Sequence, residues 1–271
     1  MALPQDYESL LNYAELIHAV YCQSTHGLAI DVVHWFQFSD FPRDRDSGFI
    51  GLDHTSKEVV VVMAGTGNDH DWFRNAQFIS VPHELCHRCS VHRGFGRIAG
   101  SLVKEQKVIK SLMKKHPDYK LVFTGHSLGG AIVQLFALHF VEYYDQMLVV
   151  TYASPRVGNV EFANHMDQVL DTLSHCRHSI ETQRLSGGHI SVTHVGDIVP
   201  GLPPGYAQSG CQYHITKGPL PHPPDSLVRS DAKAETGGDE VGEQTWGRIW
   251  RQQEHKLQMA HTEYFIDISS C

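Results

Sequence analysis

The chain has 271 residues, of which 41% are hydrophobic, and it carries 22 basic against 30 acidic side chains, a formal net charge of −8. This length suits one large α/β domain or two small ones, and the hydrophobic share is ample for a packed core. The negative charge and the lack of a basic tract argue against nucleic acid as a partner, and any lipid contact should be apolar.

Helical spacing of apolar residues from Asp6 to Tyr21 predicts a packed amphipathic helix. The runs 49–52 and 58–63 predict two paired strands joined through 53–56. A second amphipathic helix is expected over 97–116, ending at Pro117.

A buried strand over 119–124 and a helix over 131–138 follow, and further buried strands are expected at 148–152 and 190–195. Strand and helix therefore alternate through the middle of the chain, which favours a mostly parallel sheet covered on both faces. The proline-rich stretch 219–244 is interpreted as a long surface excursion, because the chain beyond it is too short to fold alone.

The N-terminus lacks the charged and apolar regions of a signal peptide, and no apolar run reaches membrane-spanning length. The best candidate, residues 131–141, is interrupted by Gln134 and His139. Either the protein is intracellular, or this is a mature secreted form with an added Met1.

The most informative motif is Gly125-His126-Ser127-Leu128-Gly129, a G-x-S-x-G pattern between the expected strand and helix. A nucleophile elbow requires this setting, in which a sharp strand-to-helix turn lifts a serine hydroxyl above the sheet. The two outer glycines fit because the turn leaves no room for side chains, and the first helix amides could stabilise an oxyanion.

A serine nucleophile needs a base and an orienting carboxylate, which follow in the order Ser, Asp or Glu, His in α/β-hydrolases. Asp197 is the best carboxylate, because it follows a strand at the catalytic edge of the sheet. An ordinary turn aspartate before Pro200 is the alternative. Chain order alone does not choose between His255 and His261 as the base.

Six cysteines are compatible with three disulfides: one that ties the termini together, one that closes a local C-x-x-C loop, and one between the remaining two. The alternative is six reduced thiols in a cytosolic enzyme. The expected pairs are Cys22–Cys271, Cys86–Cys89 and Cys176–Cys211.

Histidines and cysteines between residues 83 and 92 are crowded enough to suggest zinc. A local disulfide and surface histidines explain the same residues, so neither a metal nor a cofactor is expected. The set is His83, Cys86, His87, Cys89 and His92.

Several segments together resemble the fungal class 3 lipase family, which includes acylglycerol lipases and feruloyl esterases. They occur in family order over about residues 50–271, so the resemblance is more specific than any one motif. The matching segments are Val91 to Phe95, Gly125 to Gly130, Ser154 to Asn159, His194 to Pro200 and His261 to Phe265.

The resemblance implies an α/β-hydrolase fold, expected as a single domain over residues 1–271. It implies Ser127 as the nucleophile, His261 as the base and Asp197 as the residue that orients the base. It also implies the disulfide between Cys22 and Cys271.

The family's oxyanion residue lies in a Gly-Thr or Gly-Ser pair after the first long strand, which corresponds here to Gly65-Thr66. The backbone amides of Thr66 and Leu128 would then bind the oxyanion, assisted by the Thr66 hydroxyl. The chain has Ala64 where the family usually has arginine, so the usual anchor of this loop is missing.

In the family's lipases a lid follows the oxyanion residue, and here it would run over 67–82. An ordinary loop whose aromatic side chains pack on the core is the alternative. The apolar side chains that could dock on a lipid interface are Trp72, Phe73, Phe78 and Ile79.

We therefore expect a secreted, monomeric lipase that cleaves acylglycerols through an acyl-enzyme and contacts a lipid–water interface transiently through its lid. The apolar lid favours a lipase. A feruloyl or other soluble-ester esterase with the same triad is one alternative, and a catalytically silent lipid-binding protein is another.

Overall fold

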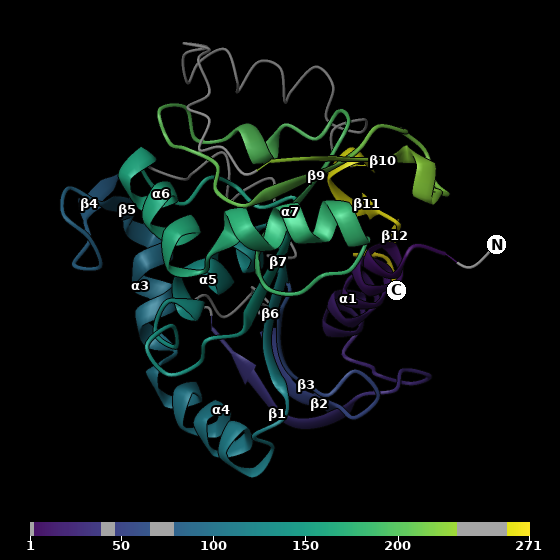
Figure 1. Cartoon of the computed structure of the whole chain (residues 1–271), viewed down its shortest axis with the longest axis horizontal. Helices are drawn as coiled ribbons and strands as arrows, with labels where there is room; N and C mark the ends of the chain where they lie inside the picture. The colour runs from purple at the N-terminus through teal and green to yellow at the C-terminus, as the bar shows by residue number, and fades with distance from the viewer. Residues whose placement is uncertain (1–2, 39–46, 66–78, 232–258) are drawn as a thin grey trace.

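A large mixed sheet forms the centre of the structure, a computed structural model that describes residues 3–38, 47–65, 79–231 and 259–271 (Figure 1). Within these residues the sheet has eight strands in the order β1-β2-β3-β6-β7-β8-β9-β10. The strands are β1 Asp31–Gln37, β2 Ser47–Asp53, β3 Glu58–Met63, β6 Lys120–His126, β7 Met147–Tyr152, β8 Gly188–His194, β9 Cys211–Ile215 and β10 Leu227–Ser230.

The central part of the sheet is parallel from β3 through β9, and antiparallel strands β1, β2 and β10 complete its edges. The carboxyl ends of the parallel strands therefore meet at one edge, where α/β sheets carry their ligand sites. This arrangement confirms the predicted mostly parallel sheet. The β2–β3 pair also confirms the expected strand pairing through 53–56.

Helices cover both faces of the sheet, as predicted. Figure 1 shows α3, α4 and α5 on one side of the strands and α1 on the other. The α-helices among the described residues are α1 Gln5–Tyr21, α3 Arg93–Ser101, α4 Val103–Lys115, α5 Leu128–Ala137, α6 Val160–Val169 and α7 Thr172–Thr182.

The residues of β3 show how one strand serves two hydrophobic cores. Val59 and Val61 belong to the core under α3, α4 and α5. Val60 and Val62 point the other way and belong to the core around α1. Each is fully buried, and burying a valine side chain contributes about 1.5 kcal/mol or more. Continuous apolar runs of this kind are typical of strands covered on both faces.

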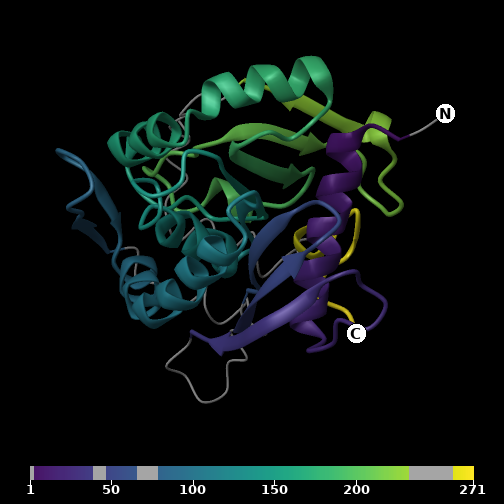
Figure 2. The same cartoon turned by 60° about the horizontal axis from the view of Figure 1, so that its bottom comes forward.

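In the described part of the chain, two small antiparallel pairs lie outside the main sheet. Strands β4 (Ser80–Pro82) and β5 (Ser90–His92) form a hairpin that projects from the body of the molecule in both views (Figures 1 and 2). Strands β11 (Glu263–Tyr264) and β12 (Ile266–Asp267) belong to the C-terminal segment, which lies beside α1 in Figure 2.

The single helix expected over 97–116 is wrong, because two helices occupy this stretch with a break at Leu102. The Ser101 hydroxyl donates to the Ile98 carbonyl at 2.7 Å, a local bond that competes with continued helix. The turn buries Leu102 and leaves Val103 55% exposed. The first helix also starts earlier than expected, at Arg93, because its glycines hide the helical pattern.

The interpretation of 219–244 as a surface excursion is also wrong in part, because Leu227–Ser230 is the edge strand β10. Arg229 on this strand donates to the fully buried Asp6 carboxylate at 2.7 and 3.0 Å, which ties the edge strand to α1. Such a pair lies far apart in sequence and leaves no local signal. Residues 232–244 lie outside the described part.

The three expected disulfides are present: Cys22–Cys271, Cys86–Cys89 and Cys176–Cys211. The first joins the end of α1 to the C-terminal residue, the second closes the β4–β5 hairpin, and the third joins α7 to β9. Among the described residues, no helix combines the length and apolar character needed to cross a bilayer.

We expect the disulfides to contribute unequally to stability. Cys22 and Cys271 are separated by 249 residues and Cys86 and Cys89 by three. In the loop-entropy treatment, the two bridges are worth about 5 and about 2 kcal/mol respectively. Replacing Cys22 and Cys271 with serine should therefore lower the thermal midpoint more than replacing Cys86 and Cys89. Equal losses, or six free thiols by mass spectrometry of the unreduced protein, would contradict this prediction.

Candidate active site

Ser127 occupies the turn between β6 and α5 in a backbone conformation that few non-glycine residues adopt, with φ 52° and ψ −123°. Its amide donates to the Tyr152 carbonyl at 2.9 Å, which pins the turn to β7. A Cβ at Gly125 would lie 2.6 Å from the Gly129 backbone, and one at Gly129 would lie 2.5 Å from the Met63 carbonyl oxygen. The motif therefore forms a nucleophile elbow, and both glycines are required by close backbone approach.

His261 lies between Ser127 and Asp197, although these residues are far apart in sequence. Its Nε2 is 2.9 Å from the Ser127 Oγ, and its Nδ1 is 3.1 Å from both Asp197 carboxylate oxygens. An ionised carboxylate can only accept, so Nδ1 carries the proton of the neutral ring. Nε2 is then left as an acceptor for the serine hydroxyl proton. The structure thus brings together the three residues that the sequence singled out.

Two further donors hold the Asp197 carboxylate in place. The Val199 amide donates to Oδ1 at 3.0 Å, and the Tyr264 hydroxyl donates to Oδ2 at 2.6 Å. Burial and the neighbouring Asp197 charge raise the pKa of Tyr264 well above its usual value, so this hydroxyl keeps its proton. Tyr264 lies in the segment His261 to Phe265 that resembles the family, but nothing in the sequence predicted its contact with Asp197.

The side chains of all three residues are buried. Ser127 is 0% exposed and His261 is 2% exposed, while the Asp197 side chain is 1% exposed. Charges interact more strongly in such an environment than in water, so the Asp197 carboxylate can stabilise a positive charge on His261 effectively.

Only part of the expected oxyanion hole lies within the described residues. Leu128 is the first residue of α5, and the first amides of a helix have no partner within the helix. Gly65 ends the described stretch after β3, and its amide donates to the Tyr21 hydroxyl at 2.8 Å. Thr66 lies outside the described residues, so its role stays a prediction.

Other expected residues also fall outside the described part: Trp72, Phe73, Phe78 and the alternative base His255. Ile79 is described and half-buried, and its carbonyl accepts from the Arg93 amide at 2.8 Å. Residues 80–82 of the expected lid are paired with β5 as strand β4 of the hairpin. Cys86 and Cys89 form a disulfide and cannot act as thiolate ligands.

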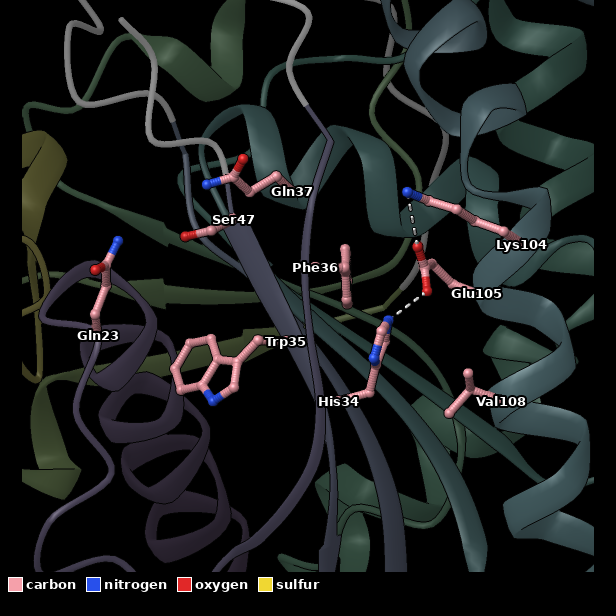
Figure 3. Close-up of a pocket in the computed structure, with 9 residues that line it drawn as sticks. All are labelled: Gln23, His34, Trp35, Phe36, Gln37, Ser47, Lys104, Glu105 and Val108. Carbon is pink, nitrogen blue, oxygen red and sulfur yellow. Dashed lines mark hydrogen bonds and ion pairs between the residues drawn. The ribbon is translucent and has the colours of Figure 1, made fainter. Parts of the chain in front are cut away.

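A cavity of about 720 Å³ lies elsewhere, where β1 and β2 approach α4 (Figure 3). The buried Glu105 carboxylate lies 2.8 Å from His34 Nε2 and 3.7 Å from Lys104 Nζ, and Figure 3 marks both contacts with dashed lines. The residues that line this cavity include none of the three brought together at the elbow. We therefore do not assign it to the candidate active site.

The sequence profile of a family described as Lipase (class 3) matches residues 60–207, more than half of the chain. The match starts in β3 and includes Ser127 and Asp197, and it ends before His261. A solved structure of the nonglycosylated LIP2 lipase of Yarrowia lipolytica has a TM-score of 0.79 and 24% identity, covering 98% of this chain and 95% of that one. This likeness shows the α/β-hydrolase fold.

Sequence relatives include secreted acylglycerol lipases of other fungi. Secreted mono- and diacylglycerol lipase 1 of Fusarium solani is 34% identical over 64% of this chain and 48% of its own length. Secreted mono- and diacylglycerol lipase A of Penicillium cyclopium is 31% identical over 67% of this chain and 55% of its own length. The matched part of the chain thus spans about half the length of these relatives.

We expect Tyr264→Phe to slow the reaction of Ser127 with an organophosphonate by about tenfold, because a hydrogen bond to a charged group is worth about 1.5 kcal/mol or more. Tyr152→Phe is the matched control, since that buried hydroxyl donates to the neutral Leu10 carbonyl at 2.6 Å. The control should lose stability without a slower labelling rate. Equal labelling rates for Tyr264→Phe and the unchanged protein would show that this hydroxyl does not support the site.

Proposed function

Because the chain belongs to the class 3 lipase family, a family of carboxylic ester hydrolases, we propose that it cleaves acylglycerols through a Ser127–His261–Asp197 acyl-enzyme mechanism. The observation that carries the proposal is the continuous contact from the Ser127 hydroxyl through the His261 ring to the Asp197 carboxylate. Serine hydrolases use such a contact to activate the nucleophile.

In the first half-reaction, the Ser127 Oγ attacks the ester carbonyl carbon and its proton passes to Nε2 of His261. Asp197 stabilises the imidazolium that forms. The carbonyl oxygen becomes an oxyanion, which the Leu128 amide and the proposed Thr66 amide would stabilise. When the tetrahedral intermediate collapses, His261 returns the proton to the leaving alcohol, and the acyl group stays on Ser127.

In the second half-reaction, a water molecule takes the place of the alcohol. His261 accepts a proton from the water as its oxygen attacks the acyl carbon, and then returns the proton to the Ser127 oxygen. The free fatty acid leaves. Asp197 keeps the same role throughout, because its oxygens hold the Nδ1 proton of His261 in both steps.

The similarity to secreted mono- and diacylglycerol lipases supports acylglycerols as the substrate class and secretion as the destination of the chain. Three disulfides agree with an oxidising compartment. A panel of triolein, a monoacylglycerol and methyl ferulate tests the substrate class. Hydrolysis of methyl ferulate alone would contradict the acylglycerol proposal and support the esterase alternative.

We expect Ser127→Ala to abolish ester hydrolysis while the protein stays folded, because no acyl-enzyme can form. His261→Ala should reduce turnover almost as far, and the double variant should lose little more, because the two residues act as a unit. Turnover of a short ester and circular dichroism measure the two properties. Unchanged turnover in His261→Ala would move the base elsewhere, with His255 as the first residue to test.

The full burial of Ser127 supports a movement of the chain before substrate binds. We propose that the lid expected from the sequence moves, in the part that precedes β4. In the open form the apolar side chains of the lid would be exposed to water, at a cost of about 2 kcal/mol for each large side chain. A lipid surface would cover these side chains and so favour the open form.

We therefore expect activity on a medium-chain ester to rise once the substrate exceeds its solubility limit. Trp72→Ala should blunt that rise, because it removes one of the apolar side chains assigned to the interface. Initial rates measured across the solubility limit provide the test. Smooth saturation in both proteins would exclude interfacial activation and favour the soluble-ester alternative.

A further inference from the structure

We propose that Tyr21 and His126 are positioning residues. Together they fix the backbone of Gly65, which precedes the proposed oxyanion residue, relative to the backbone of the proposed base His261. Both act through the backbone of another residue: Tyr21 through Gly65, and His126 through His261. We call this chain of hydrogen bonds the Tyr21–His126 bridge. The inference rests on the proposed hydrolase function, because it concerns where these groups stand during that reaction.

The Tyr21 hydroxyl, at the end of α1, joins two parts of the site. Its oxygen lies 2.8 Å from the Gly65 amide nitrogen and 2.7 Å from Nδ1 of His126. A backbone amide can only donate, so the hydroxyl accepts from Gly65. Its own proton is then available for the His126 ring.

The His126 ring completes the bridge to His261. Its Nε2 lies 2.8 Å from the His261 carbonyl oxygen, which can only accept, so Nε2 carries a proton. Burial, together with the neighbouring His261, lowers the pKa of His126 to about 3, so the ring is neutral. A neutral ring has one N–H, and Nδ1 is therefore the acceptor for the Tyr21 hydroxyl.

The direction of every hydrogen bond in the bridge is thus determined. The Gly65 amide donates to Tyr21, the Tyr21 hydroxyl donates to His126, and His126 donates to the His261 carbonyl. One end of the bridge is the residue before the proposed oxyanion residue Thr66. The other end is the backbone of the proposed base.

Packing around Gly65 leaves the bridge little freedom. A Cβ at this position would lie 2.8 Å from the Tyr21 hydroxyl oxygen and 2.9 Å from the Ser127 Cβ. The end of β3, the hydroxyl and the nucleophile are therefore packed directly against one another. Because protein interiors are close-packed, losing the hydroxyl should shift the residues around it.

The neutral state of His126 also suits its neighbour. The two rings have centroids 4.8 Å apart, and His261 becomes positively charged during the proposed reaction. A second positive charge at this distance would oppose that step. His126 can fix the backbone of the base without adding such a charge, because its ring stays neutral.

The first test is Tyr21→Phe, which removes the hydroxyl and keeps the ring that packs against His126. It leaves the Gly65 amide and the His126 Nδ1 without this partner. Since small misplacements of catalytic groups reduce rates strongly, we expect kcat on a short soluble ester to fall by about 10- to 100-fold, with KM little changed.

Tyr13→Phe is the matched control, because it removes a buried tyrosine hydroxyl from the same helix. The Tyr13 hydroxyl contacts the Glu58 carboxylate at 3.0 Å, at the opposite end of β3 from Gly65. We expect this variant to lose thermal stability and to keep its kcat. An equal loss of kcat in both variants would overturn the inference.

Amide variants of His126 separate the two halves of the bridge. His126→Gln keeps a donor near the Nε2 position, toward the His261 carbonyl, and His126→Asn keeps an acceptor near the Nδ1 position, toward Tyr21. Adding Tyr21→Phe should lower kcat further in His126→Asn, which still accepts from the hydroxyl, and little in His126→Gln. Full additivity in both backgrounds would show that the two residues act independently and would overturn the bridge.

Nitrogen-15 NMR of the histidine rings gives a measurement that needs no turnover. We expect His126 to remain in the Nε2–H form from about pH 5 to 9, with an Nδ1 signal that shifts in Tyr21→Phe as its donor is lost. An Nδ1–H ring, or a ring that titrates in this range, would overturn the bridge. The expected NMR result together with no ester hydrolysis would overturn the proposed function and leave the bridge standing.

Discussion

The close approach of helix α5 to the end of strand β3 is the constraint on which the candidate site depends. Gly129, in the first turn of the helix, faces the carbonyl oxygens of Met63 and Ala64 at distances that only glycine permits. This approach brings the start of α5, Ser127 and Gly65 into contact. The strained backbone of Ser127 is maintained because the sheet and helix around it are packed in place.

The rest of the site is supplied by segments that are distant in sequence. Asp197 follows β8, and His261 precedes the β11–β12 pair that packs beside α1. Tyr21 comes from the end of α1 itself, next to the disulfide between Cys22 and Cys271. The helix at one end of the chain and the short strands at the other therefore enclose the same site. The sheet alone would supply Ser127 and Asp197 without His261.

The parts of this structure that the sequence predicted are those with a local cause. The buried strands and the elbow follow from apolar runs and from glycines that the turn requires, so they could be located to within a few residues. Chain order and family resemblance pointed to Asp197 and His261. The sequence did not predict the strand Leu227–Ser230, which is tied to Asp6, or the contact of Tyr264 with Asp197. In both cases the partner is remote in sequence, and only the folded chain brings the two together. The helix break at Leu102 buries Leu102 and exposes Val103. The spacing of apolar residues does not distinguish two short helices of this kind from one continuous helix.

The pairing of α1 with the C-terminal segment has a consequence for the order in which the molecule assembles. Contacts between residues so far apart close a large loop, and such contacts form slowly because their entropy cost must be met first. A chain with its sheet complete but these two segments still apart would already hold Ser127 on its elbow. It would lack His261, so catalytic competence and the completion of the core around α1 depend on the same late joining of the two ends of the chain.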